Sequence, residues 1–298
     1  MLFRETDVVR STSILSGQRP LQAGKEEVAV TKVKPSTVVP VFVVGVIGAV
    51  LWANAGSLTP PPGPVASTMK TLDEVEPRVP IRQSDLPLTI TSSGSYYVVE
   101  NLNYYGTAID IQADHVSIDL EGHVFRGRLE THSGSVHSVT NGFVNDGHVM
   151  LGDHSEVTDV VSIGSPVFFG IWVGDDSRIV RCLTANTEDE GFRIGNRSII
   201  INCSYNGGGG GGGVVTGNDC IIQNCSFKGQ HHAGIACGNN CVITNCTISQ
   251  GSGWGIQTGT ACTISGSVVS DTDFGIDVGN SSTVKHLREP SSGLLVAL

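Results

Sequence analysis

Arg193 lies near acidic and aromatic residues that together could act on a sugar acid. Its guanidinium can pair with a carboxylate or, when deprotonated, accept a proton. The preceding triplet Glu188, Asp189 and Glu190 offers oxygen ligands of the kind that Ca²⁺ prefers. Trp172, upstream of the triplet, can stack on a sugar ring. These residues suggest Arg193 as a catalytic base and the triplet as a calcium site.

Two later stretches add further candidate binding groups. His231 and His232 are adjacent, and Trp254 follows them. Together with Trp172 they are predicted to contact a substrate. The alternative is an ordinary surface, because an isolated arginine is usually a solvated ion-pair partner and two adjacent histidines need further ligands to complete a metal site.

A regular glycine spacing predicts the elements that position these residues. The pair GxxxG occurs six times, and the steps between its first glycines are 21, 22, 21, 21 and 20 residues. A β-branched aliphatic residue stands five positions after each second glycine. The first glycines are Gly170, Gly191, Gly213, Gly234, Gly255 and Gly275, and the aliphatic residues are Ile179, Ile200, Ile222, Ile243, Ile264 and Val284.

A repeat of this length cannot bury a hydrophobic face alone, so successive repeats must stack around one core. The repeats contain few leucines and read as short strands separated by Gly and Asn turns, which predicts an all-β parallel β-helix. We expect a solenoid of about nine coils of roughly 21 residues. Strand alternation predicts an outward column on the first sheet of each coil. Its members are Trp172, Arg193, Val215, Ala236, Gln257 and Asp277.

Stacking also places like residues in columns at the turns. The column after the second glycine holds residue types that tolerate left-handed backbone geometry and bond their own backbone. Its members are Asp175, Asn196, Asn218, Asn239, Thr260 and Asn280. Seven of the eight cysteines form two further columns, and only Cys237 stands apart. The columns predict buried free thiols rather than disulfides, zinc or a redox pair, so no cofactor is expected apart from Ca²⁺ in an enzyme.

The N-terminal part of the chain resembles an export signal. Lys32 and Lys34 precede the apolar run Val38 to Trp52, which ends in an A-x-A cleavage site. An uncleaved single membrane span is the alternative, although the run is short for one. The predicted segments are a leader (1–37, with the true start near Val30), a signal peptide (38–55), a Pro-rich linker (56–66), an N-terminal cap (67–94), the β-helix (95–288) and a tail (289–298).

The GIxxGxxxxIxxC coils and the stretch GTAIDIQADHVSIDLEGHVFRG resemble right-handed parallel β-helix proteins of the pectate-lyase-like superfold. The stretch AGSLTPPPGPVASTMKTLDEVEPRVPI looks like the start of uncharacterised secreted bacterial proteins of this type. The resemblance covers about residues 53–285. It implies the fold but no single activity, because this architecture carries lyases, hydrolases, epimerases, tailspikes and adhesins.

Signature motifs of these enzymes narrow the activity that the resemblance implies. The polygalacturonase-type series of motifs and the Asp-Pro-His signature of alginate-type epimerases are absent from the sequence. The pectate-lyase pattern, an arginine base with acidic calcium ligands, remains open through Arg193.

The net charge of the chain indicates which classes of binding partner are favoured. A formal net charge of −10 opposes binding to nucleic acid or anionic membranes and favours neutral glycans or protein partners. We therefore expect a secreted or cell-envelope rod that is noncatalytic and structural or glycan-binding, with no stable membrane span after cleavage. The alternatives are a lyase or epimerase acting on a uronate polymer, and an adhesin or assembly subunit that associates end to end.

Overall fold

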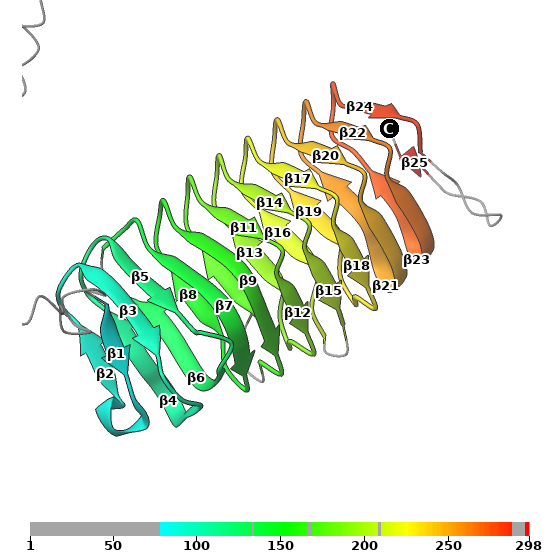
Figure 1. The fold of residues 1–298 in the computed structure, drawn as a ribbon. Coiled ribbons are helices and arrows are strands. Elements are labelled where there is room, and N and C mark those ends of the chain that lie inside the picture. The colour runs from blue at the N-terminus through cyan, green and yellow to red at the C-terminus, as the bar shows by residue number, and fades with distance from the viewer. Residues whose placement is uncertain (1–77, 133, 166–168, 208–209, 288–295, 298) are drawn as a thin grey trace, which may run out of the picture. The chain divides into compact units, whose positions relative to one another are not determined.

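The computed structural model describes residues 78–132, 134–165, 169–207, 210–287 and 296–297. The chain divides into two units, 1–66 and 67–298, and all the described residues belong to the second. The predicted leader, signal peptide and linker lie outside the described residues. Strands at equivalent positions of successive turns pair in parallel and build the solenoid of Figure 1, whose described part holds one 3₁₀ turn, η1 (Gln83–Asp85), and no α-helix.

Three parallel sheets run along the solenoid. The first sheet contains the ends of four long strands, β4 (Leu102–Ile111), β6 (Val124–Thr131), β21 (Thr247–Thr258) and β23 (Val268–Asp277). Its other strands are β2 (Leu88–Ile90), β8 (Val149–Leu151), β10 (Ile171–Val173), β13 (Phe192–Ile194), β16 (Val214–Thr216), β19 (Ile235–Cys237) and β25 (Val296–Ala297).

The second and third sheets complete each turn. The second consists of β1 (Val79–Ile81), β3 (Gly94–Val98), β5 (Val116–Asp119), the starts of β7 (Ser138–Asn145) and β9 (Glu156–Ile163), β11 (Arg178–Val180), β14 (Ile199–Ile201), β17 (Ile221–Gln223), β20 (Val242–Thr244), β22 (Thr263–Ser265) and β24 (Thr283–Lys285). The third combines the remaining halves of the long strands with β12 (Leu183–Ala185), β15 (Ser204–Asn206) and β18 (Ser226–Lys228).

The register confirms the predicted repeat. On the first sheet the inward residues pair in the order Ile171, Phe192, Val214, Ile235, Ile256, Ile276, with the same steps as the glycines. The predicted β-branched column pairs in the second sheet, and Ile179, Ile222, Ile243 and Ile264 are fully buried. The solenoid has about ten turns, close to the nine predicted. Among the described residues parallel pairing is already present at Val79, within the segment expected to be a cap, and the expected tail contains β25.

Close packing explains why both positions of GxxxG are glycine. A Cβ on Gly213, the first glycine of its pair, would lie 2.4 Å from the Gly234 carbonyl oxygen and 2.7 Å from the Phe227 ring. A Cβ on Gly195, a second glycine, would lie 2.5 Å from the Asp175 backbone nitrogen. Real Cβ atoms do not approach so closely, so each turn stacks on the next only where these side chains are absent.

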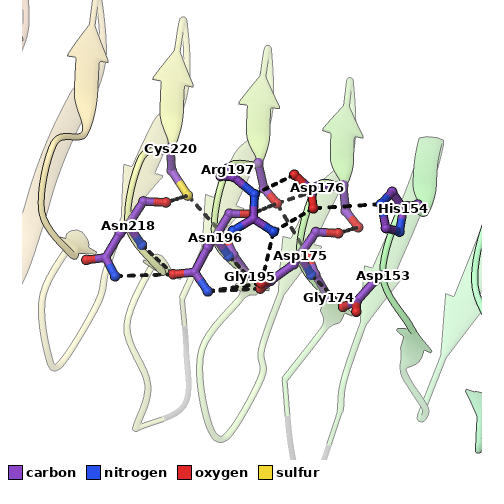
Figure 2. Close-up of polar contacts among 12 residues, drawn as sticks. Asp153, His154, Gly174, Asp175, Asp176, Gly195, Asn196, Arg197, Asn218 and Cys220 are labelled. Carbon is purple, nitrogen blue, oxygen red and sulfur yellow. Dashed lines mark hydrogen bonds and ion pairs between the residues drawn. The ribbon is translucent and has the colours of Figure 1, made fainter.

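The polar column after the second glycine forms a hydrogen-bonded ladder (Figure 2). The backbone N–H of Asn196 donates to Asp175 Oδ1, and that of Asn218 donates to Asn196 Oδ1, each at 2.8 Å. The prediction that these residues take the left-handed conformation and bond their own backbone is wrong. The next residue of each turn has the positive φ, as at Asp176 and Arg197 (both 54°), which leaves the ladder side chain directed at the neighbouring turn.

The cysteines occupy the two predicted columns as free thiols. Cys182, Cys203, Cys225 and Cys246 are buried in one, and Cys220, Cys241 and Cys262 in the other. Their thiols donate to backbone carbonyls, as Cys220 Sγ does to the Gly195 oxygen at 3.1 Å. Within the part of the chain that the structure describes, no helix has the length and apolarity needed to cross a membrane.

Candidate functional site

The outer face of the first sheet carries the candidate site. The predicted outward column is confirmed, because Trp172 pairs with Arg193 and the register continues through Val215, Ala236 and Gln257 to Asp277. The structure extends the column upstream through Met150, Glu130, Asp110 and Thr89. From Glu130 to Gln257 it spans six strand spacings, or about 29 Å.

An aromatic and cationic cluster occupies the middle of this face. Phe169, in the turn before β10, packs edge-on against Trp172 with ring centroids 5.2 Å apart. The Arg193 guanidinium lies 5.8 Å from the Phe169 centroid and 5.9 Å from the Trp172 centroid, within cation–π range. Its Nη1 atom is 3.8 Å from Glu190 Oε2. Arg193 is therefore held between two aromatic rings and a carboxylate.

Glu190 is the carboxylate of this face with the most altered environment. Burial raises its pKa above the ordinary value, and the negative charge of Asp189 adds to this effect. Its buried Oε2 atom accepts no hydrogen bond from the described residues, since the contact with Arg193 is too long for one. A raised pKa makes the ionised carboxylate a stronger base than a solvated one.

A pocket of about 470 Å³ opens beside Glu190 and brings several predicted residues together. His231, His232 and Trp254 line its wall, and Val215, Ala236 and Gln257 of the outward column lie at its base. Trp254 stacks against Phe274, with ring centroids 4.8 Å apart and an interplanar angle of 31°. His231 Nδ1 is 3.2 Å from Ser252 Oγ. The pocket offers one aromatic wall and several polar groups.

The other predicted residues lie around this pocket. Trp172 and Arg193 contact each other but do not line it, although Arg193 pairs with Val215, which does. Of the acidic triplet only Glu190 lines the pocket. Among the described residues, the one set of three His, Cys, Asp or Glu ligand atoms that converge within 4.8 Å consists of cysteines, so a calcium site at the triplet stays a prediction.

A second pocket, which the sequence analysis missed, lies upstream on the same edge. It measures about 560 Å³, and its lining includes Tyr104, Arg128 and His148. His148 Nε2 is 2.9 Å from Glu130 Oε1, and the Thr107 hydroxyl donates to Glu130 Oε2 at 2.6 Å. Burial lowers the pKa of His148, and the charge of Glu130 opposes this in part.

His148 also connects the second pocket to the aromatic cluster, because its ring lies 6.3 Å from that of Phe169. Glu130 occupies the same register position as Trp172 and Arg193. This register is the sequence signal that could have identified Glu130 as a member of the outward column. The upstream turns lack the GxxxG pair that marks the register downstream, so the repeat spacing could not be extended from sequence to the turn that contains Glu130. The face as a whole therefore presents two pockets flanking an aromatic and cationic centre.

A match to a protein-family model agrees with this architecture. Residues 143–288 match the family model described as a right handed beta helix region. A search of curated proteins found no match. Among solved structures, the chain is similar to the mannuronan C-5 epimerase AlgE6 A-module of Azotobacter vinelandii (12% identity, 69% of this chain and 90% of that one, TM-score 0.41).

Two viral structures are similar at the same level. One is ORF18 of Geobacillus virus E2 (11% identity, 70% of this chain and 56% of that one, TM-score 0.47), and the other is the Dettilon tailspike protein (11%, 67% and 59%, TM-score 0.37). The chain thus spans little more than half of each viral protein. Since the strand register and the family match agree, this chain is a right-handed parallel β-helix repeat protein.

Proposed function

We propose that this protein binds a polysaccharide along the outer face of the first sheet. The observation that carries the proposal is the pocket in which the stacked pair Trp254 and Phe274 stands beside His231, His232 and Gln257. Sugar rings present apolar C–H faces and a rim of hydroxyl groups, and a site for them combines aromatic surfaces with hydrogen-bonding side chains.

The shape of the face suits a polymer rather than a single sugar. The aromatic centre at Phe169 and Trp172 continues the line of the pocket, and the second pocket, which His148 lines, lies beyond it. An extended chain could contact all three places over about 29 Å. The net charge of −10 disfavours a highly anionic polymer, so a neutral or weakly acidic glycan fits best.

Affinity measurements on a panel of neutral and acidic polysaccharides test this proposal. Trp254→Ala is expected to weaken binding about fivefold or more, since loss of an aromatic contact surface costs roughly 1 kcal/mol or more. Ile221→Ala is the matched control, because Ile221 is exposed on the second sheet. No binding by the wild type, or equal loss in both variants, would reject the proposal. The secreted or cell-envelope location predicted from residues 38–55 belongs to the same proposal.

One observation favours a second candidate, a lyase or epimerase acting on a uronate polymer. Glu190 combines a raised pKa with a place in the pocket and an arginine at 3.8 Å. In this arrangement Glu190 would transfer the proton and Arg193 would hold the substrate carboxylate, because a neighbouring acid disfavours a deprotonated arginine. Absorbance of unsaturated uronate, with and without Ca²⁺, would detect a lyase. Proton exchange with solvent would detect an epimerase. Either activity should vanish in Glu190→Gln.

A further inference from the structure

Three cysteine thiols converge inside the solenoid, away from the glycan face. The sulfur atoms of Cys237, Cys241 and Cys262 all lie within 4.8 Å of one another. Cys237 ends strand β19, Cys241 follows in the turn that leads to β20, and Cys262 occupies the same position one turn later. Cys237 is the residue that the column pattern left apart, and the structure places it against Cys241 and Cys262 of one column.

The backbone does not require cysteine at these turn positions. In this column Ser177 and Ser198 occupy the earlier turns, and Ser282 the last. The serine hydroxyls accept the backbone N–H of the preceding turn at 2.9–3.1 Å, whereas the N–H of Cys241 reaches Cys262 Sγ at 3.4 Å. Serine therefore serves the ladder at least as well, and the cysteines call for another explanation.

The neighbouring inward column changes in the same turns. Its residues are Val173 and Ile194 in the earlier turns but Thr216, Cys237 and Thr258 beside the cysteines. Thr216 and Thr258 are almost fully buried, and their hydroxyls donate to backbone carbonyls. A stretch of the core thus changes from aliphatic to small polar and sulfur-bearing side chains.

The other cysteine column has no such companion. Cys182, Cys203, Cys225 and Cys246 follow one another along the solenoid axis, and within the described residues no further cysteine converges on them. Successive members of a single column are separated by the strand spacing along one line, so they cannot surround a point. The cluster at Cys237 is therefore distinct in geometry as well as composition.

We propose that Cys237, Cys241 and Cys262 form a three-thiolate site for a thiophilic d¹⁰ metal ion, Cu(I) or Zn²⁺. Thiolates select these soft ions, and sulfur atoms that share a metal at about 2.3 Å lie roughly 3.8–4.0 Å apart. The observed separations thus need only a small contraction. Each thiol releases its proton to solvent as its sulfur binds the metal.

The exposure of the three residues indicates how a metal ion would reach the site and which cysteine is best substituted. Cys237 is the one cysteine of the eight that is not fully buried, whereas Cys241 and Cys262 are at 0%. Cys237→Ser should therefore disturb the core least. Cys225→Ser is the matched control, because Cys225 lies in the other column and is itself buried.

The test uses the full chain, reduced and kept without oxygen. One arm titrates Cu(I) from its bicinchoninate complex, and the other titrates Zn²⁺ against a chromophoric chelator. We expect one metal ion per chain in at least one arm, with X-ray absorption showing three sulfur neighbours at about 2.2–2.3 Å. Cys237→Ser should lose at least tenfold in affinity and Cys225→Ser should retain it, with circular dichroism confirming that both fold.

Two outcomes would overturn the proposal. The first is a folded, fully reduced wild-type chain that binds neither ion. The second is binding that persists unchanged in Cys237→Ser. The X-ray absorption measurement uses the wild type alone, so the sulfur count remains decisive even where a variant fails to fold. Neither result depends on whether the outer face binds a glycan.

Discussion

His148 Nε2 lies 2.9 Å from Glu130 Oε1, and both side chains are almost completely buried, with exposures of 3% and 9%. The histidine comes from the turn before β8 and the glutamate from the end of β6. The Thr107 hydroxyl donates to the other carboxylate oxygen, so an acid, a base and a hydroxyl form one hydrogen-bonded network behind a pocket that His148 lines. In a buried polar network, loss of one partner leaves another polar group unpaired at a cost in free energy. Substitutions in this network should therefore have measurable effects on stability.

The first prediction concerns the pH dependence of stability through His148. Its pKa in the folded chain lies below the ordinary value of 6.5, chiefly because of burial. Between these two values the unfolded chain binds more protons, so the free energy of unfolding decreases as the pH falls through this interval. Urea unfolding measured from neutral pH downward should show this slope. It should be reduced in His148→Gln, and an identical slope in both proteins would contradict the prediction.

The Glu130 charge also predicts a shift that NMR can measure. Because Glu130 raises the pKa of His148, Glu130→Gln should lower this pKa further while keeping a hydrogen-bonding side chain. Titration of the imidazole signals would follow the change. A raised His148 pKa in the variant would contradict this account.

The pKa of Glu190 is shifted in the opposite direction, above its ordinary value. Its pKa is raised by burial and Asp189 and is partly lowered by Arg193, so Arg193→Ala should raise it further. In the wild type the folded chain binds more protons than the unfolded chain above the ordinary value of 4.5, and stability therefore decreases as the pH rises through the folded pKa. NMR titration of the Glu190 carboxyl would measure both variants. Arg178→Ala, which changes an exposed arginine on β11, should leave the pKa unchanged.

Close packing at the repeat glycines predicts that replacing one of them with alanine lowers the free energy of unfolding. Gly213→Ala would place a Cβ 2.4 Å from the Gly234 carbonyl oxygen, and relief requires a backbone shift in the stacked turns. We expect a loss of about 1–3 kcal/mol or more in the free energy of unfolding. Gly210→Ala is the control, since its nearest contact would be 3.5 Å and its expected change is within about 0.5 kcal/mol. Equal effects at both positions would contradict the packing argument.

The hydrogen-bonded ladder predicts that the side-chain oxygen of each asparagine contributes more to stability than its amide nitrogen does. Asn239 Oδ1 accepts the Thr260 backbone N–H at 2.8 Å. Asn239→Ala removes this acceptor at an exposed turn and should cost about 0.5–1.5 kcal/mol. Asn239→Asp keeps the oxygen and should cost less, as the aspartate at the same position, Asp175, already serves the ladder. Thermal unfolding of the two variants would test this order.

The repeating part of the fold was open to prediction from sequence. In a parallel β-helix each residue pairs with its counterpart one repeat away, so the glycine period alone leads to the register of Trp172 on Arg193 and to the buried isoleucine columns. Alternation along short strands likewise predicts which residues face outward. These properties depend only on neighbours in the repeat. The left-handed position was misplaced by one residue, because Asn and Asp suit both a ladder and a turn.

Only the tertiary structure decided which side chains meet. The loops that lead into the first sheet differ in length and path, and they determine that Glu190 joins His231, His232 and Trp254 while Glu188 and Asp189 do not line the pocket. The pairing of His148 with Glu130 and the approach of Cys237 to the cysteine column likewise join residues without a shared repeat position. A period specifies backbone register, whereas convergence of side chains depends on the irregular connections between the strands.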